Sequence, residues 1–140
     1  MPIQIAATDA QLERCFPVMG ELRPHLTREQ FVTQVRRQRD TQGYELAFLE
    51  VKGEVVAAAG FRIVEMLAWG RAMYVDDLVT TAQRQGQGFA TELFDWLVAR
   101  ARTAGCAQLH LDSGVHRHRA HRFYLCREMD ITSHHFALKL

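Results

Sequence analysis

Two glycines one residue apart, in the stretch Gln83-Arg84-Gln85-Gly86-Gln87-Gly88, lie where a strand-like run gives way to a helix-like one. The first backbone N–H groups of a helix have no partner within the helix, and their partial positive charge attracts anions. Glycine lets the backbone approach a bulky anion without a Cβ in the way, and Arg84 can bind a phosphate. The residues alone leave two interpretations open, a diphosphate-binding loop and an ordinary glycine-rich turn.

Two other phosphate-binding motifs are excluded. The chain has no GxxxxGK[ST], so the loop is not a P-loop. The glycines do not form GxGxxG and no first βαβ unit precedes them, which argues against a Rossmann dinucleotide site.

Adjacent carboxylates, Asp76 and Asp77, stand shortly before the loop. Neighbouring side chains of a regular strand face opposite sides, so only one of the two can point into any single pocket. Asp77 then shares a face with Val79, and Asp76 shares one with Tyr74 and Leu78. The remaining carboxylate is expected in solvent or at the sheet edge.

Six of the seven residues from His116 to Arg122 are basic. Such a run is typical of a solvated helix face, and the alternative is an anion site at Arg117, Arg119 or Arg122. The net charge of +1 and the lack of interleaved aromatic residues argue against nucleic-acid binding. No metal is expected, because no Cys/His spacing defines a site, and a metal site from His118, His121, His134 and His135 is the alternative for the histidines.

The elements that must position these residues follow from periodicity and capping signals. We expect strands at 3–7, 44–51, 55–66, 71–80, 107–113 and 131–140, and helices at 9–22, 28–40, 88–104 and 119–128. Thr27 and Gln30 form a capping box for the second helix. The order β-α-α-β-β-β-α-β-α-β predicts one α/β domain over residues 1–140, with a mixed, twisted sheet flanked by about four helices.

Composition predicts a cytoplasmic protein with no membrane partner. No apolar run reaches the roughly 18 residues of a membrane span, and the N-terminus is too polar and acidic for a signal peptide. The three cysteines cannot all pair and form no CxxC motif, so we expect reduced thiols.

The loop and its neighbours resemble the acetyl-coenzyme A site of the GCN5-related N-acetyltransferase (GNAT) superfamily. The family's [Q/R]-x-x-G-x-[G/A] loop is matched by Gln83, Gly86 and Gly88, and its second signature, A-x-x-F-Y, by Ala120, Phe123 and Tyr124. Two positions depart from the family pattern. Arg117 replaces an Asn that bonds the pantetheine, and Glu128 replaces a Gly that takes a left-handed cap more easily.

The resemblance implies acetyl-coenzyme A as co-substrate and assigns roles to residues. Tyr124 would be the general acid to the coenzyme A sulfur, since an ordinary phenol with a pKa of about 10 is protonated at neutral pH. A core-packing role for Tyr124 is the alternative. Asp77, slightly favoured over Asp76, would be the base, usually through water, and the N–H of Val79 would polarise the acetyl carbonyl. The cofactor-binding residues would be Leu78, Val79, Thr80, Gln83, Arg84, Gln85, Gly86, Gln87, Gly88, Phe89, Ala90, Thr91, Arg117, Ala120 and Phe123, although Phe123 also fits a core position.

The function implied is transfer of the acetyl group to a primary amine of a small molecule, by direct attack in a ternary complex. No cysteine has a supporting base nearby in sequence, which argues against an acyl-cysteine. The C-terminal spelling RHRAHRFYL then SHHF most resembles the aminoalkylphosphonate N-acetyltransferase branch. The alternatives are a non-catalytic acyl-coenzyme A-binding or sensing module and a protein or peptide amine as substrate. The resemblance also suggests a homodimer.

Overall fold

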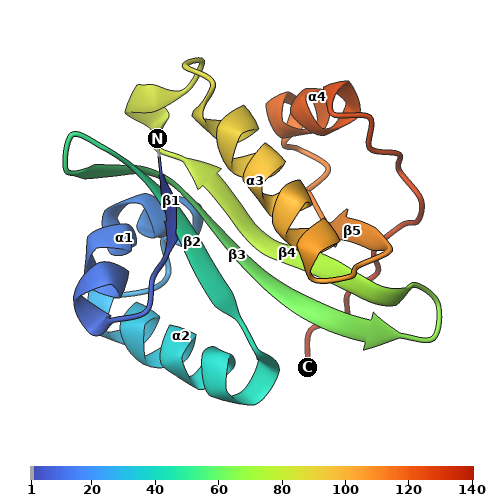
Figure 1. Cartoon of the computed structure of the whole chain (residues 1–140), viewed down its shortest axis with the longest axis horizontal. Coiled ribbons are helices and arrows are strands. Elements are labelled where there is room, and N and C mark those ends of the chain that lie inside the picture. Colours follow the sequence, from blue (N-terminus) through green and yellow to red (C-terminus); the bar gives the residue numbers. More distant parts are fainter. Residues whose placement is uncertain (1) are drawn as a thin grey trace. The chain divides into compact units, whose positions relative to one another are not determined.

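The protein is described over residues 2–140 by a computed structural model. Its elements are β1 (Ile3–Ile5), α1 (Asp9–Leu22), α2 (Arg28–Gln42), β2 (Glu45–Val51), β3 (Glu54–Met66), β4 (Gly70–Thr80), the short 3-10 helix η1 (Ala82–Arg84), α3 (Phe89–Thr103), β5 (Gln108–Leu111) and α4 (His118–Cys126). Up to α4 this order confirms the predicted α/β architecture (Figure 1). The chain divides into two compact parts, the first ending at His110 and the second running Leu111–Leu140, and each is described by itself.

Matching capping boxes start the first two helices. The Thr8 hydroxyl accepts from Gln11 N at 3.2 Å, and the Gln11 side-chain oxygen accepts from Thr8 N at 3.1 Å. Thr27 and Gln30 make the same exchange at 3.2 and 2.9 Å, as predicted for the second helix. Each box satisfies backbone N–H groups that a helix start otherwise leaves without partners.

The five strands form one sheet in the order β1-β2-β3-β4-β5 (Figure 1). The first three pairings are antiparallel. β5 lies beside β4 after the α3 connection, which makes the sheet mixed. The predicted mixed sheet is confirmed.

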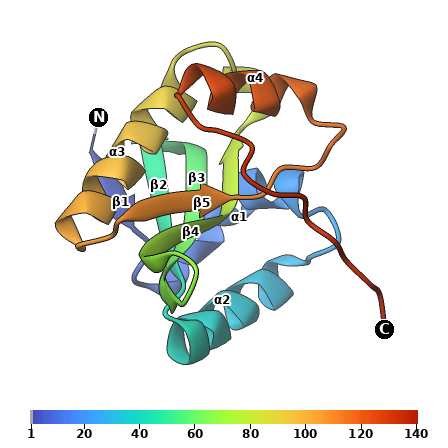
Figure 2. The same cartoon turned by 90° about the vertical axis from the view of Figure 1, so that its right-hand side faces the viewer.

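Both faces of the central strands are buried. Leu46, Phe48 and Ala58 join the hydrophobic cluster beneath α1 and α2. On the other face, Phe61 packs edge-on against Trp96 of α3, with ring centroids 6.1 Å apart. Helices therefore cover the sheet on both sides (Figure 2), and the run of small side chains Ala57–Ala59, which is fully buried, lets them approach closely.

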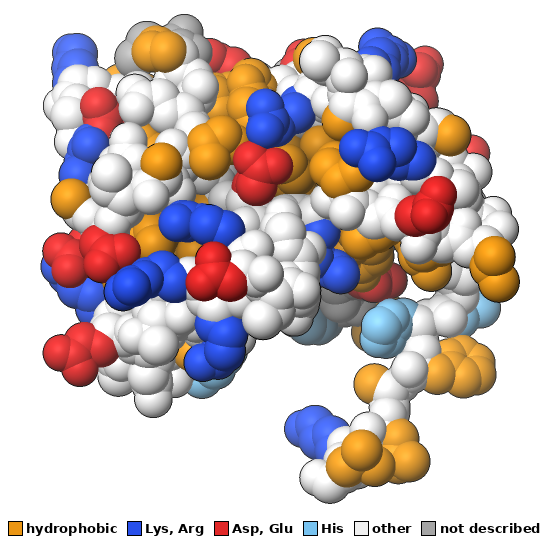
Figure 3. Space-filling view, turned by 60° about the horizontal axis from the view of Figure 1, so that its bottom comes forward, with side chains coloured by type: hydrophobic (Ala, Val, Ile, Leu, Met, Phe, Trp, Pro, Cys, Tyr) orange, Lys and Arg blue, Asp and Glu red, His pale blue; other side chains and the backbone are white. Residues whose placement is uncertain are grey.

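Charged side chains of both signs intermingle on the face drawn in Figure 3. Ion pairs such as Arg36–Asp9 (3.4 Å) and Arg100–Glu45 (2.9 Å) join opposite charges at the surface of the first part of the chain. Within residues 2–140, no helix is both long enough and apolar enough to cross a membrane.

The predicted closing strand at residues 131–140 is wrong. Beyond Cys126 the described chain forms neither helix nor strand. A strand needs a hydrogen-bonded neighbour to be stable, and no pairing includes this segment. The apolar residues of this segment alternate as they do in a strand, but no neighbouring strand pairs with it.

Glu128, just after α4, has a φ of 66°. This is the left-handed conformation, which glycine adopts more easily than a residue with a Cβ. A left-handed backbone costs an L-residue with a Cβ about 1–2 kcal/mol. The end of α4 therefore has a left-handed residue that is strained by its side chain.

Replacing Glu128 with glycine is expected to raise the free energy of unfolding by about 1 kcal/mol, because glycine adopts a positive φ without a steric penalty. Urea denaturation followed by circular dichroism measures the change. Glu128→Ala is the control, since it removes the charge but keeps the Cβ. Equal stability of the Gly and Ala variants would contradict the assignment of strain.

Candidate functional site

The glycine loop has the backbone geometry that only glycine adopts without strain. Gly86 and Gly88 have φ values of 81° and 86°, and Gly88 is the N-cap of α3. A Cβ built on either glycine would meet no atom within 4 Å. The protein itself leaves the space beside both residues open, so a ligand can approach the backbone there.

The start of α3 is uncapped, in contrast to those of α1 and α2. No side chain caps it, and the first helical hydrogen bond is from Glu92 N to Gly88 O, at 3.0 Å. The N–H groups of Phe89, Ala90 and Thr91 therefore have no acceptor within the helix. Three such groups at the positive end of a helix form a site for an anion.

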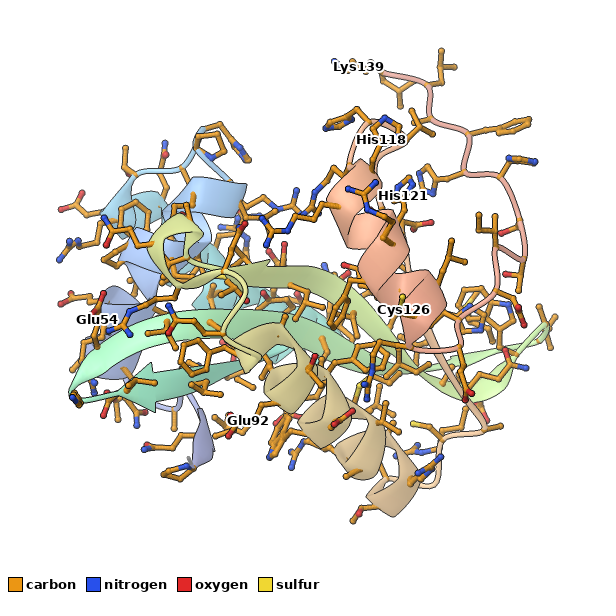
Figure 4. All side chains as sticks on the ribbon, turned by 90° about the horizontal axis from the view of Figure 1, so that it is seen from above. Glu54, Glu92, His118, His121, Cys126 and Lys139 are labelled. Carbon is orange, nitrogen blue, oxygen red and sulfur yellow. The ribbon has the colours of Figure 1, made fainter. Side chains whose placement is uncertain are left out.

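Two loop side chains turn back onto the protein. Arg84 Nη2 lies 3.5 Å from a carboxylate oxygen of Glu54, which Figure 4 labels at the start of β3. The Gln85 amide lies 3.5 Å from the carbonyl oxygen of Thr80. Since a guanidinium has five N–H donors, the contact with Glu54 leaves Arg84 able to bind a phosphate as well.

Backbone groups alternate in direction along β4. In an antiparallel pair, one residue bonds its neighbour and the next points its N–H and C=O away. Thr81 N donates to Val56 O at 2.9 Å, and the register continues with Thr80 opposite Ala57 and Val79 opposite Ala58. The backbone N–H and C=O groups of Val79, like those of Thr81, are therefore directed at β3.

The prediction that the Val79 N–H polarises a bound carbonyl is therefore wrong, because this N–H is directed at β3. Leu78 and Thr80 direct their backbone groups at the opposite edge of β4. β5 begins after Ala107, which donates to Arg71 O at 2.8 Å, and has only four residues. Four residues span about 13 Å, so β5 lies beside only the first part of β4 and does not extend to Leu78 and Thr80.

The pairing of β3 with β4 contains a bulge. Gly60 pairs with Asp77, but the next residue, Phe61, pairs with Val75. Asp76 is therefore an extra residue in β4. A bulge interrupts the strict alternation of side chains and bends the strand.

As a result, Asp76 and Asp77 lie on the same face of the sheet, and the prediction that they face opposite sides is wrong. Arg62 binds Asp76, and Arg62 shares a face of β3 with Gly60 two residues earlier. The Tyr44 hydroxyl, which lies over Gly60, binds Asp77. Strand periodicity could not detect the bulge, because the inserted residue looks like any other strand residue.

Asp77 is held from two sides. Tyr44 Oη donates to one carboxylate oxygen at 2.8 Å, and Arg23 Nε donates to the other at 2.9 Å. Burial, reinforced by the charge of Asp77, raises the pKa of Tyr44 well above its usual value, so the phenol stays a donor. The Asp77 side chain is only 13% exposed.

Asp76 is bound bidentately by Arg62, at 2.8 and 2.9 Å, and its backbone carbonyl accepts from Arg23 at 3.1 Å. Arg62 also lies over the ring of Tyr74, 5.2 Å from its centroid. The hydrogen bond to Asp76 raises the pKa of Arg62. The two carboxylates and two guanidinium groups together form one neutral cluster at the bulge.

Sequence reasoning did not single out Tyr44, Arg23 or Arg62 as members of this cluster. Arg23 and Tyr44 are 54 and 33 positions from Asp77, and no local spacing connects them. One signal was present, the isolated Gly60 inside a strand, which is typical of a bulge or of a close approach.

The second part of the chain carries the other predicted site residues. Ala120, Phe123 and Tyr124 lie on α4, and Arg117 is at its N-cap without a side-chain cap. Burial raises the pKa of Tyr124, with the charge of Arg117 acting in the opposite direction. The phenol is therefore protonated at neutral pH, as a proton donor must be.

The histidines of the basic run are arranged along α4. His118 and His121 project from the helix one turn apart, with ring centroids 6.1 Å from each other (Figure 4). His121 Nε2 lies 2.7 Å from the carbonyl oxygen of Gly114, a contact that orients its ring.

Comparisons with known proteins agree on one family. A family model described as "Acetyltransferase (GNAT) family" matches residues 7–127. The uncharacterized N-acetyltransferase YhdJ of Bacillus subtilis (strain 168) is 32% identical over 109 residues, which are 78% of this chain and 77% of that protein.

Solved structures share the fold at low identity. The ribosomal-protein-alanine N-acetyltransferase of Brucella melitensis biovar Abortus 2308 superposes with a TM-score of 0.85 at 16% identity, over 100% of both chains. The aminoglycoside N-acetyltransferase AAC(6')-Iy, in complex with CoA, superposes with a TM-score of 0.84 at 10% identity, over 99% of this chain and 95% of that one.

Replacing Gly60 with alanine is expected to lower the free energy of unfolding by about 3 kcal/mol, the upper range for overpacking. The new Cβ would lie 1.7 Å from Tyr44 Oη, so the ring would have to leave Asp77. Urea denaturation measures the loss. Gly20→Ala is the control, because its Cβ would meet only the Phe16 ring at 3.5 Å, an ordinary contact. Unchanged stability in Gly60→Ala would show that the fold does not depend on the Tyr44 ring staying over residue 60 and in contact with Asp77.

Proposed function

Because the chain belongs to the acetyltransferase (GNAT) family and is an acyltransferase, we propose that it transfers the acetyl group of acetyl-coenzyme A to a primary amine of a small molecule. One observation carries the proposal. The uncapped start of α3 follows two left-handed glycines with open space beside them, in the connection that leads from β4 to the helix. This arrangement fits a diphosphate, and the family match supports coenzyme A as its source.

The donor site extends along β4. The N–H groups of Phe89, Ala90 and Thr91, with the loop from Gln83 to Gly88, bind the diphosphate. The free edge of β4 at Leu78 and Thr80 binds the pantetheine, which is extended and can pair with a strand. The N–H of Leu78 takes the role that the sequence had assigned to Val79, polarising the acetyl carbonyl.

The amine attacks the thioester carbonyl directly. A C–N bond forms while the oxygen gains negative charge, and the N–H of Leu78 stabilises that charge. The C–S bond then breaks, and Tyr124 gives its proton to the departing thiolate. The proton lost by the amine passes through water to a carboxylate at the bulge, with Asp77 favoured over Asp76 as the base.

Cys15 does not suit a covalent acyl-cysteine, and direct attack remains the proposed route. Cys15 is fully buried, and desolvation raises the pKa of its thiol to about 12. The thiolate, which is the nucleophilic form, is therefore almost absent at neutral pH.

In the second part of the chain, the basic residues Arg117, Arg119 and Arg122 suit an acceptor amine that carries an anionic group, as the likeness to the aminoalkylphosphonate branch also suggests.

The decisive assay is thiol release from acetyl-coenzyme A with a panel of small amines, aminoalkylphosphonates and peptides. We expect turnover with a small amine, and a fall in kcat of about a hundredfold in Tyr124→Phe, the low end for a general acid. Coenzyme A binding by that variant should be unchanged. If acetyl-coenzyme A raises the melting temperature but no amine is acetylated, the protein is a non-catalytic binding module. Turnover with peptides alone would make the acceptor a protein amine.

Gly88→Ala is expected to weaken coenzyme A binding at least tenfold, because a Cβ enters the space beside the helix start and the positive φ becomes strained. Isothermal titration calorimetry measures the Kd. Gly43→Ala is the matched control. Gly43 also has a positive φ, of 69°, with nothing within 4 Å of a Cβ, but it ends α2. Equal loss of binding in both variants would mean that the effect is one of stability, not of the site.

A further inference from the structure

Two residues at the end of α1 contact the chain on either side of the proposed donor edge, one within β4 and one just after it. Arg23, the C-cap of α1, binds the side chain of Asp77 and the carbonyl oxygen of Asp76. Glu21, in the last turn of the helix, binds Thr81 and Ala82. Between these contacts lie Leu78, Val79 and Thr80.

The contacts of Glu21 hold the point where the strand becomes the loop. One carboxylate oxygen accepts from the Thr81 hydroxyl at 2.6 Å, and the other accepts from Ala82 N at 2.9 Å. Thr81 is itself fixed at its other groups. Its N–H donates to Val56 O, its carbonyl accepts from Arg84 N, and its exposed fraction is 9%.

The position of Glu21 is unfavourable for α1 itself. The C-terminal end of a helix carries partial negative charge, so a carboxylate in the last turn is repelled. The last turn of α1 has no basic residue to offset it, whereas those of α2 and α3 carry Arg39 and Arg100 with Arg102. The carboxylate at position 21 is therefore explained by its contacts with Thr81 and Ala82 and not by the helix.

α1 is a firm support for such contacts. Leu12, Cys15, Val18 and Met19 are almost completely buried beneath it. The loop that follows Ala82 has no comparable packing, since the residues from Gln83 to Gly88 are mostly exposed. Contacts at the first residues of the loop therefore limit where its glycines can lie.

We propose that Glu21 is a positioning residue for the donor site, which places the start of the glycine loop for binding of the coenzyme A diphosphate. The inference rests on the proposed function, because it assumes that this loop binds coenzyme A. Glu21 does not touch the ligand. It acts through Thr81 and Ala82, and Arg23 holds the other end of the same segment at the bulge.

The test measures the Kd for coenzyme A by isothermal titration calorimetry, which needs no acceptor amine. Glu21→Ala is expected to raise the Kd about tenfold, as for loss of a hydrogen bond to a charged group. Glu21→Gln should restore most of the affinity, since its amide oxygen can still accept from Ala82 N. Thr81→Val should weaken binding and Thr81→Ser should not, because serine keeps the hydroxyl.

The combined Glu21→Ala/Thr81→Val variant should bind no more weakly than Glu21→Ala alone, because both changes remove the same contact. Glu13→Ala is the matched control, an exposed glutamate earlier in α1, and should bind like wild type. Thermal unfolding without ligand shows whether each variant is folded at the titration temperature.

The outcomes separate the two proposals. Failure of the wild-type protein to bind coenzyme A would overturn the proposed function. Wild-type binding with an unchanged Kd in folded Glu21→Ala would overturn the positioning role alone. So would equal weakening in Glu13→Ala, or a loss in Glu21→Ala that the glutamine variant does not reverse.

Discussion

The extra residue in β4, Asp76, is the feature from which the geometry of the site follows. By interrupting the ladder with β3, the bulge places two consecutive carboxylates on one face of the sheet. It also reverses the alternation of side chains and backbone groups for the residues of β4 that follow. Beyond the bulge, the backbone groups of Leu78 and Thr80 point at the free edge of the strand. The four-residue β5 lies beside the earlier part of β4 and does not reach that edge.

The bulge is stabilised by groups that arrive from elsewhere in the chain. The Tyr44 ring crosses Gly60, where any side chain would collide with it, and its hydroxyl binds Asp77. Arg23 and Arg62 neutralise the two carboxylates through hydrogen-bonded ion pairs. Partly buried carboxylates need such partners. The same contacts therefore offset the free-energy cost of burying the carboxylates and hold β4 in its bent course at the bulge.

The helix starts divide into two kinds, and the difference has a functional meaning. α1 and α2 satisfy their first N–H groups with capping boxes, whereas α3 begins at a glycine with no side-chain cap. A helix start that its own sequence leaves unsatisfied is available to an anionic ligand. Glu21 adds a link between the two kinds of helix, because it joins the end of the well-packed α1 to the segment that leads into α3.

Local signals predicted most of the elements, because each depends on residues close in sequence. The Thr27–Gln30 box, the strand periods and the loop with Gly86 and Gly88 all act within a few positions. Three expectations were wrong, and each depended on distant partners. The faces of Asp76 and Asp77 and the direction of the Val79 N–H depended on the register with β3, and the closing strand at 131–140 depended on a neighbour to pair with.

The sequence by itself indicated where the proposed donor loop lies, since two glycines before a helix can be read from spacing and from the positive φ that glycine tolerates. Only the tertiary structure decided which backbone groups of β4 are free and which carboxylates share a face. The reason is that a one-residue bulge inverts the side-chain and hydrogen-bonding phase of a strand. This inversion is set by the partner strand and by Tyr44 over Gly60, neither of which is local to β4.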